Sequence, residues 1–208
     1  MYYGQNEEDK ILLDYFAEED PTKLNILDIG ANDGITLSNS YAAIKKGWNA
    51  CLVEPSPIVF EKLRNLHRDN GKVHLFEYAI SRSNLNNVTF YESGSLLTKH
   101  DHALVSSLSN TETQKWRGAG TEFNTILVKT RTFDKFMNES PLKTFDAISI
   151  DCEGEDLNVL KQINLRQVKC RFLIVEFNGK DGNLFKIYCE YMGMKLVYSN
   201  AENLIFTI

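Results

Sequence analysis

The chain has 208 residues, the size of one domain with a single core, so we expect one domain over residues 1–208. No apolar run approaches the roughly 20 residues that cross a bilayer, and a net charge of −5 without a basic stripe disfavours a nucleic-acid partner. The four cysteines are scattered and MYYGQNEEDK lacks an apolar signal core. We therefore expect reduced thiols in a cytoplasmic protein, rather than disulfides or a zinc site.

The first third of the chain alternates between helices and strands. Residues 5–17 show apolar positions at helical spacing, residues 24–29 predict a strand of the buried type, and residues 38–46 predict a helix that Gly47 ends. A second strand covers 50–53. A helix that begins at Pro57 and a third strand over 73–79 follow.

The alternation of helices and strands is interrupted between residues 81 and 131. Residues 88–91 and 125–130 alternate like edge strands around a polar stretch, which predicts an inserted β-arm on the substrate side. The regular pattern then returns, with predicted strands at 147–150, 172–175, 195–198 and 204–207 and predicted helices at 155–163 and 182–192. Continuous apolar strands between helices indicate a three-layer α/β fold with a mainly parallel sheet and an antiparallel edge.

The turn after the first strand reads ILDIGANDG, and its charges indicate the kind of ligand. Gly30 and Gly34 are spaced G-x-x-x-G, with Asn32 between them, whereas a dinucleotide loop has G-x-G-x-x-G. Carboxylates at Asp28 and Asp33 would repel a pyrophosphate, but they suit the ammonium and sulfonium of S-adenosylmethionine. An NAD-dependent oxidoreductase is disfavoured on both counts.

Glu54 ends the second strand, about 20 residues after Gly34, where an acidic residue holds the ribose hydroxyls of adenosine cofactors. The alternative for Glu54 and Asp28 is a carboxylate at a strand end with no ligand. Together with the glycine turn, they favour an adenosyl cofactor.

The chain resembles the FkbM-type family of S-adenosylmethionine-dependent methyltransferases along nearly its full length. The matching stretches are YGQNEEDKIL, LDIGANDGITL, LVEPSP, EYAIS, VKTRTFDKFM, AISIDCEGEDLNVLK and LIVEFN. The resemblance implies a Rossmann-like class I methyltransferase with a seven-stranded sheet, the β-arm lying between its third and fourth strands, and a hydroxyl of a sugar or small metabolite as the acceptor. Its implied cofactor contacts are Gln5, Asp28, Gly30, Asn32, Gly34, Glu54, Ala79 and Asp151, with Tyr3 and Asp9 as further candidates or as helix-capping residues.

A second carboxylate cluster follows the predicted strand at 147–150. Asp151 and Glu153 precede a helix at the edge where the methyl group should lie, and either could remove the proton of an acceptor hydroxyl. Alternatively, Asp151, Glu176 and Asn178 could hold Mg²⁺ or another divalent cation through hard oxygen ligands.

The insertion carries the remaining candidates. His102 and His100 could act as a base or could simply be solvated, and Trp116 and Phe123 could line an acceptor pocket or anchor the arm. Two rival functions remain open. One is an N-methyltransferase on nucleic acid or protein, which the acidic DCEG segment disfavours, and the other is a domain that binds the cofactor without turnover. The oligomeric state cannot be predicted from the sequence.

Overall fold

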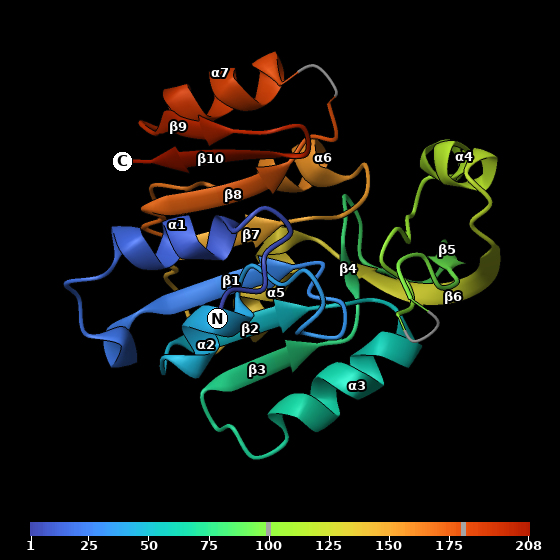
Figure 1. The fold of residues 1–208 in the computed structure, drawn as a ribbon, viewed down its shortest axis with the longest axis horizontal. Helices are drawn as coiled ribbons and strands as arrows, with labels where there is room; N and C mark the ends of the chain where they lie inside the picture. The colour runs from blue at the N-terminus through green and yellow to red at the C-terminus, as the bar shows by residue number, and fades with distance from the viewer. Residues whose placement is uncertain (99–100, 180–181) are drawn as a thin grey trace.

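A computed structural model describes residues 1–98, 101–179 and 182–208. Its main sheet has seven strands in the order β3-β2-β1-β7-β8-β10-β9 (Figure 1). These strands are β1 (Asn25–Ile29), β2 (Asn49–Val53), β3 (Val73–Phe76), β7 (Ala147–Ile150), β8 (Phe172–Glu176), β9 (Lys195–Ser199) and β10 (Asn203–Thr207). Strands β3, β2, β1, β7 and β8 pair in parallel, while β10 pairs antiparallel with both β8 and β9. The predicted parallel sheet with an antiparallel edge is confirmed.

Helices cover both faces of this sheet and make the three predicted layers. On one face, α1 (Glu8–Tyr15), α2 (Tyr41–Lys45) and α3 (Pro57–His67) pack against alternate residues of the strands. On the other face, α5 (Phe133–Glu139), α6 (Asp156–Leu160) and α7 (Asn183–Tyr191) pack against the intervening residues. A short 3₁₀-helix, η1 (Pro21–Lys23), leads into β1.

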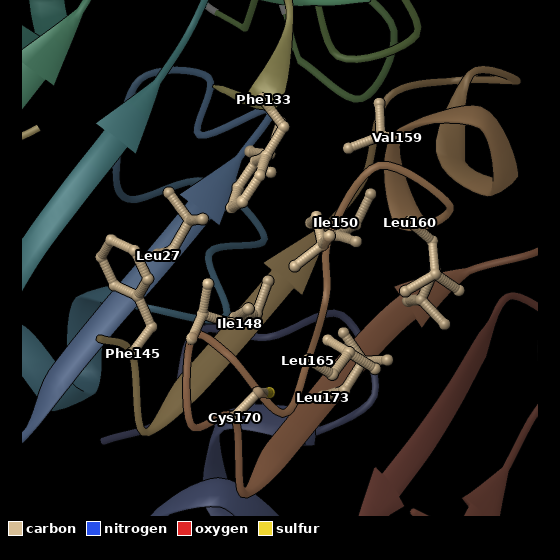
Figure 2. Packing of buried hydrophobic residues seen from close by; sticks show 14 of the residues in the cluster. Leu27, Phe133, Phe145, Ile148, Ile150, Val159, Leu160, Leu165, Cys170 and Leu173 are labelled. Carbon is tan, nitrogen blue, oxygen red and sulfur yellow. The ribbon is translucent and has the colours of Figure 1, made fainter. Parts of the chain in front are cut away.

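Figure 2 shows how apolar side chains of the central strands pack on one face of the sheet. Leu27, Ile148 and Leu173 come from three neighbouring strands and point to the face where Phe133 of α5 and Val159 of α6 also lie. Their sequence neighbours, among them Ile26, Ala147 and Phe172, point to the opposite face and pack under α1 and α2. Because both faces are covered, successive residues are apolar instead of alternating with polar ones.

The insertion forms a second sheet, with the order β4-β6-β5, beyond the carboxyl ends of the parallel strands (Figure 1). It consists of β4 (Ala79–Ile80), β5 (Leu85–Ser93) and β6 (Phe123–Arg131), with α4 (Asn110–Gly118) between β5 and β6. The predicted β-arm is confirmed. The predicted third strand over 73–79 is divided, because β3 ends at Phe76 while Ala79 pairs with Thr130 of the arm.

Two further observations concern membrane-spanning helices and the cysteines. No helix in the described part of the chain has the length and apolar character needed to span a bilayer. All four cysteines are free: Cys51, Cys170 and Cys189 are buried and Cys152 is partly buried, as expected for reduced thiols.

Candidate active site

A cavity of about 440 Å³ lies at the carboxyl ends of β1, β2, β7 and β8, the edge where open parallel sheets bind ligands. The predicted site residues that line it are Gln5, Asp28, Gly30, Asn32, Glu54, Ala79, Asp151, Glu153, Glu176 and Asn178. Its other acidic side chains are Glu155 and Glu202. Among the described residues, no lysine, arginine or histidine lines it. The cavity therefore favours cationic or neutral ligands over phosphates.

Gly30 is required because β1 and β7 approach each other closely at their ends. Its φ is +93°, and a Cβ there would lie 1.8 Å from the carbonyl oxygen of Asp151. The Gly30 and Ala31 amides both donate to the Val53 carbonyl, which fixes the turn against β2. Gly30 thus sets the distance between the glycine turn and the segment that carries Asp151.

Gly34 and Asp33 do not occupy the positions expected of ligand contacts. A Cβ on Gly34 would lie 2.5 Å from Leu63 Cδ1, so this glycine allows the turn to pack on α3 and does not line the cavity. The Asp33 carboxylate accepts the amides of Ile35 and Thr36 and the Thr36 hydroxyl. Asp33 therefore stabilises its own loop and does not line the cavity, because its carboxylate oxygens already accept hydrogen bonds from neighbouring residues.

Asp28 does line the cavity, as predicted from its place at the end of β1. It is buried, and Ser40 Oγ donates to its Oδ2 at 2.5 Å, while Ser149 on the neighbouring strand is its second hydrogen-bond partner. Burial raises the pKa of Asp28 to about 6, and the two serine hydroxyls limit that rise. Asp28 is thus ionised at neutral pH and is held in place by hydroxyls without a counter-charge.

Glu54 is oriented by the backbone of two loops. Its Oε2 accepts the Asn32 amide at 2.9 Å and its Oε1 accepts the Ser56 amide at 2.7 Å. Burial raises the pKa of Glu54 to about 7, although these two amides oppose the rise. Asn32 itself has a φ of +48°, and its side-chain amide donates to the carbonyl of His102. The glycine turn, the end of β2 and the insertion therefore meet around one carboxylate.

The segment before α1 is tied to the far edge of the sheet. Gln5 lines the cavity, whereas Tyr3 and Asp9 do not; the Asp9 carboxylate accepts the Tyr3 amide and shapes the segment locally. The sequence analysis missed Glu8, whose Oε1 accepts the side-chain amides of Asn200 and Asn203 next to β10. Burial raises the pKa of Glu8, but the hydrogen bonds lower it more. No sequence signal marks such a contact between the two ends of the chain.

Asp151, Glu153 and Glu176 come together at the ends of β7 and β8. One carboxylate oxygen from each lies within 4.8 Å of the others. Glu153 and Glu176 are buried, while the Asp151 side chain is exposed to the open volume of the cavity. Desolvation raises the pKa values of all three. Repulsion from Glu153 adds to the rise at Asp151 and Glu176, whereas repulsion from Asp156 adds to it at Glu153, and a hydrogen bond with Glu176 opposes the rise at Asp151.

Glu153 is the member of this cluster that contacts the insertion. Burial raises its pKa to about 7, whereas Lys115 of α4, whose Nζ lies 3.8 Å from Glu153 Oε2, lowers it. The Asn178 side-chain amide donates to the same oxygen at 3.4 Å. Trp116 Nε1 faces this carboxylate but lies outside hydrogen-bonding geometry, and within the described part of the chain it is buried without a partner. A carboxylate with a pKa near neutrality suits proton transfer.

The other predicted residues of the insertion separate into two groups. Trp116 lines the cavity, but Phe123 does not and instead packs under the guanidinium of Arg117, which lies 4.9 Å from the ring centre. His102 does not line the cavity either; its backbone carbonyl, and not its ring, makes the contact with Asn32. Its expected role as a base is therefore not supported by its position. His100 lies outside the described residues.

The chain matches the family model of the methyltransferase FkbM domain over residues 28–199. It is 27% identical over 157 residues to 2-O-methyltransferase NoeI of Sinorhizobium fredii, a match that covers 75% of this chain and 64% of that protein. Two solved structures share the fold. The FkbM methyltransferase of Methylobacillus flagellatus has a TM-score of 0.52 at 14% identity, with 94% of this chain and 50% of that chain covered. The precorrin-6y C5,15-methyltransferase of Geobacter metallireducens has a TM-score of 0.52 at 13% identity, with 96% and 85% covered. The matched region is thus under two thirds of NoeI and half of the M. flagellatus chain. The chain belongs to the FkbM methyltransferase family.

Proposed function

We propose that the protein transfers a methyl group from S-adenosylmethionine to a hydroxyl of a sugar or a related small metabolite. The observation that carries this proposal is one cavity with two acidic ends. Glu54 lies at the end of β2, and Asp151, Glu153 and Glu176 lie at the ends of β7 and β8. The relative NoeI is named a 2-O-methyltransferase, which supports an oxygen acceptor.

The cofactor end fits an adenosyl group with positive charges. The two amides that hold Glu54 leave its carboxylate facing the cavity, where it can accept the ribose hydroxyls. Asp28 supplies a negative charge nearby, and Asn39 Oδ1, which also lines the cavity, is buried without a donor. Both features suit an ammonium group. When bound, the cofactor supplies an activated methyl group, so the protein must mainly align the acceptor and remove its proton.

At the acceptor end, Glu153 is the base that we propose. Its pKa of about 7 lets it be largely ionised at slightly alkaline pH and still take up a proton. Asp151, which lies beside Glu176, can orient the acceptor hydroxyl through a hydrogen bond. Trp116 lines the cavity on the side of the insertion. We propose that this insertion, residues 81–131, binds the acceptor.

The carboxylate cluster also fits a divalent cation. Its ligands are hard oxygens, and Glu176 Oε2 is buried without a partner among the described residues. Asp151, Glu153 and Glu176 would hold the ion, with Asn178 beside Glu153. The ion would lower the pKa of a coordinated hydroxyl. Mg²⁺ is therefore a candidate ligand of this cluster in the proposed reaction. We place the reaction in the cytoplasm, because all four cysteines are free.

Two measurements test the proposal. In calorimetry, S-adenosylhomocysteine should bind and NAD should not, and the opposite result would refute the cofactor assignment. A panel of neutral sugars, offered with S-adenosylmethionine that carries a radiolabelled methyl group, should then reveal an acceptor. With that acceptor, Asp151→Asn and Glu153→Gln should lower turnover and leave S-adenosylhomocysteine affinity nearly unchanged. Full activity in both variants would reject the assigned base.

A further inference from the structure

We propose that the insertion positions Glu153, with Ser107 holding its backbone and Lys115 holding its carboxylate. This inference rests on the proposed function, in which Glu153 is the base. It adds Ser107 and Lys115 as positioning residues, which act through Glu153 and are not themselves assigned a contact with the acceptor.

The first observation is the backbone of Glu153. Its φ is +47°, a left-handed conformation that is unfavourable for a side chain with a Cβ, and Gly154 follows with a φ of +106°. Such strained residues persist only where their surroundings hold them, and they gather at functional sites. The contacts that hold Glu153 in this conformation therefore indicate how the residue is positioned for its function.

The second observation is the hydrogen bond made by Ser107. Its hydroxyl donates to the Glu153 carbonyl at 2.7 Å and accepts the Ser109 amide at 2.9 Å, so the direction of its proton is set. Ser107 is buried and is itself fixed to β5, since its amide and carbonyl both bond to Tyr91. The strained peptide is thus attached to the sheet of the insertion, and not to the main sheet, through this bond.

The third observation is the close approach of α4. A Cβ on Gly154 would lie 2.4 Å from Cγ of Glu112, so α4 packs directly on the peptide that follows Glu153. One turn further along α4, Lys115 Nζ reaches Glu153 Oε2 at 3.8 Å. The Lys115 side chain is partly exposed whereas the Glu153 carboxylate is buried, and at 3.8 Å the contact is long for an ion pair, so we expect it to contribute little to stability. We therefore assign Lys115 a role in directing the carboxylate.

Thermal unfolding tests whether Ser107 holds Glu153, and it needs no acceptor. Ser107→Ala should lower the Tm of the wild-type protein by about 1–6 °C. In a Glu153→Gly background the same change should lower the Tm by more, because the wild-type chain offsets part of the lost hydrogen bond by releasing strain at Glu153, whereas glycine adopts the left-handed conformation without strain. Ser109, which caps α4 without a side-chain hydrogen bond to it, is the control: Ser109→Ala should have the same effect in both backgrounds. An equal or smaller loss for Ser107→Ala in the Glu153→Gly background would overturn the inference.

Kinetics with the acceptor from the sugar panel test whether this positioning matters. Ser107→Ala and Lys115→Met should each lower kcat by about 10- to 100-fold, with the KM for S-adenosylmethionine within about twofold of wild type. Lys115→Arg should recover most of the loss. Arg117→Met removes a positive charge from the same helix and should behave as wild type, since Arg117 packs on Phe123.

The outcomes separate the two proposals. An unchanged kcat in Ser107→Ala and Lys115→Met, or an equal loss in Arg117→Met, would overturn the positioning role even if unfolding shows the coupling. Failure to bind S-adenosylhomocysteine would reject the proposed function alone, because the unfolding measurement does not depend on it.

Discussion

Replacing Glu54 by glutamine is the sharpest test of the cofactor site, since it changes one atom type in a carboxylate that two backbone amides already hold. Each oxygen of Glu54 accepts one of these amides, from Asn32 and from Ser56. Glutamine has one acceptor oxygen, so its NH₂ group must face the other amide. Leaving a buried donor without a partner costs about 1–3 kcal/mol, which corresponds to a fall in Tm of about 2–12 °C for a chain of this size.

The effect on ligand binding should be larger, because the ribose hydroxyls lose a charged acceptor. Hydrogen bonds to charged groups contribute about 1.5–3 kcal/mol, so affinity for S-adenosylhomocysteine should fall by about 10- to 150-fold. Calorimetry at pH 8 is suitable, since burial raises the pKa of Glu54 to about 7 and the carboxylate is mainly ionised at that pH. Glu77→Gln, at an exposed carboxylate just after β3, is the control. An affinity of Glu54→Gln within twofold of this control would refute the assignment of Glu54 to the ribose.

Further predictions concern the turn, the proton balance and the metal. Gly30→Ala should lower both Tm and activity strongly because its Cβ meets the Asp151 carbonyl, whereas Gly118→Ala, with no atom within 4 Å of its Cβ, should be neutral in unfolding experiments. If Glu153 is the base, kcat/KM should rise with pH up to about 7 and level off above, and a rate that falls over this range would contradict the assignment. The raised pKa of Glu54 means that the folded protein binds more protons than the unfolded chain between about pH 4.5 and 7, so its contribution to stability is lost as pH rises through 7. Unfolding of Glu54→Gln should consequently depend less on pH than that of the wild type. EDTA should lower turnover and Mg²⁺ should restore it if the carboxylate cluster holds an ion, and activity that is indifferent to EDTA would remove the ion from the proposal.

The strands could be predicted because each carries its own signal. Residues 172–175 are apolar throughout and residues 147–150 are apolar apart from Ser149, since helices cover both faces of the sheet, and the structure places β7 and β8 there. Helix α4 carries no such signal. Its sequence, NTETQKWRG, has few apolar residues and only Thr113 is buried, so no helical periodicity predicts it.

The strand-end acids could also be placed from sequence. Parallel strands end at one edge, so Asp28, Glu54, Asp151 and Glu176 were expected to lie along the same cavity, and all four line it. Asp33 and His102 lie in loops, where the direction of a side chain depends on nearby backbone groups and not on a repeating pattern. The Asp33 carboxylate accepts hydrogen bonds from amides of its own loop, and His102 contacts Asn32 through its backbone carbonyl and not through its ring.

The sequence by itself determined the parallel sheet, the glycine turn and the acids at its edge, because hydrophobic periodicity and glycine spacing are local properties of the chain. Only the tertiary structure decided how the insertion meets that edge. Ser107 and Lys115 are distant in sequence from Glu153, and their contacts with it exist only after two sheets have packed together. No pattern within either segment encodes that approach, and the conformation of Glu153 depends on it.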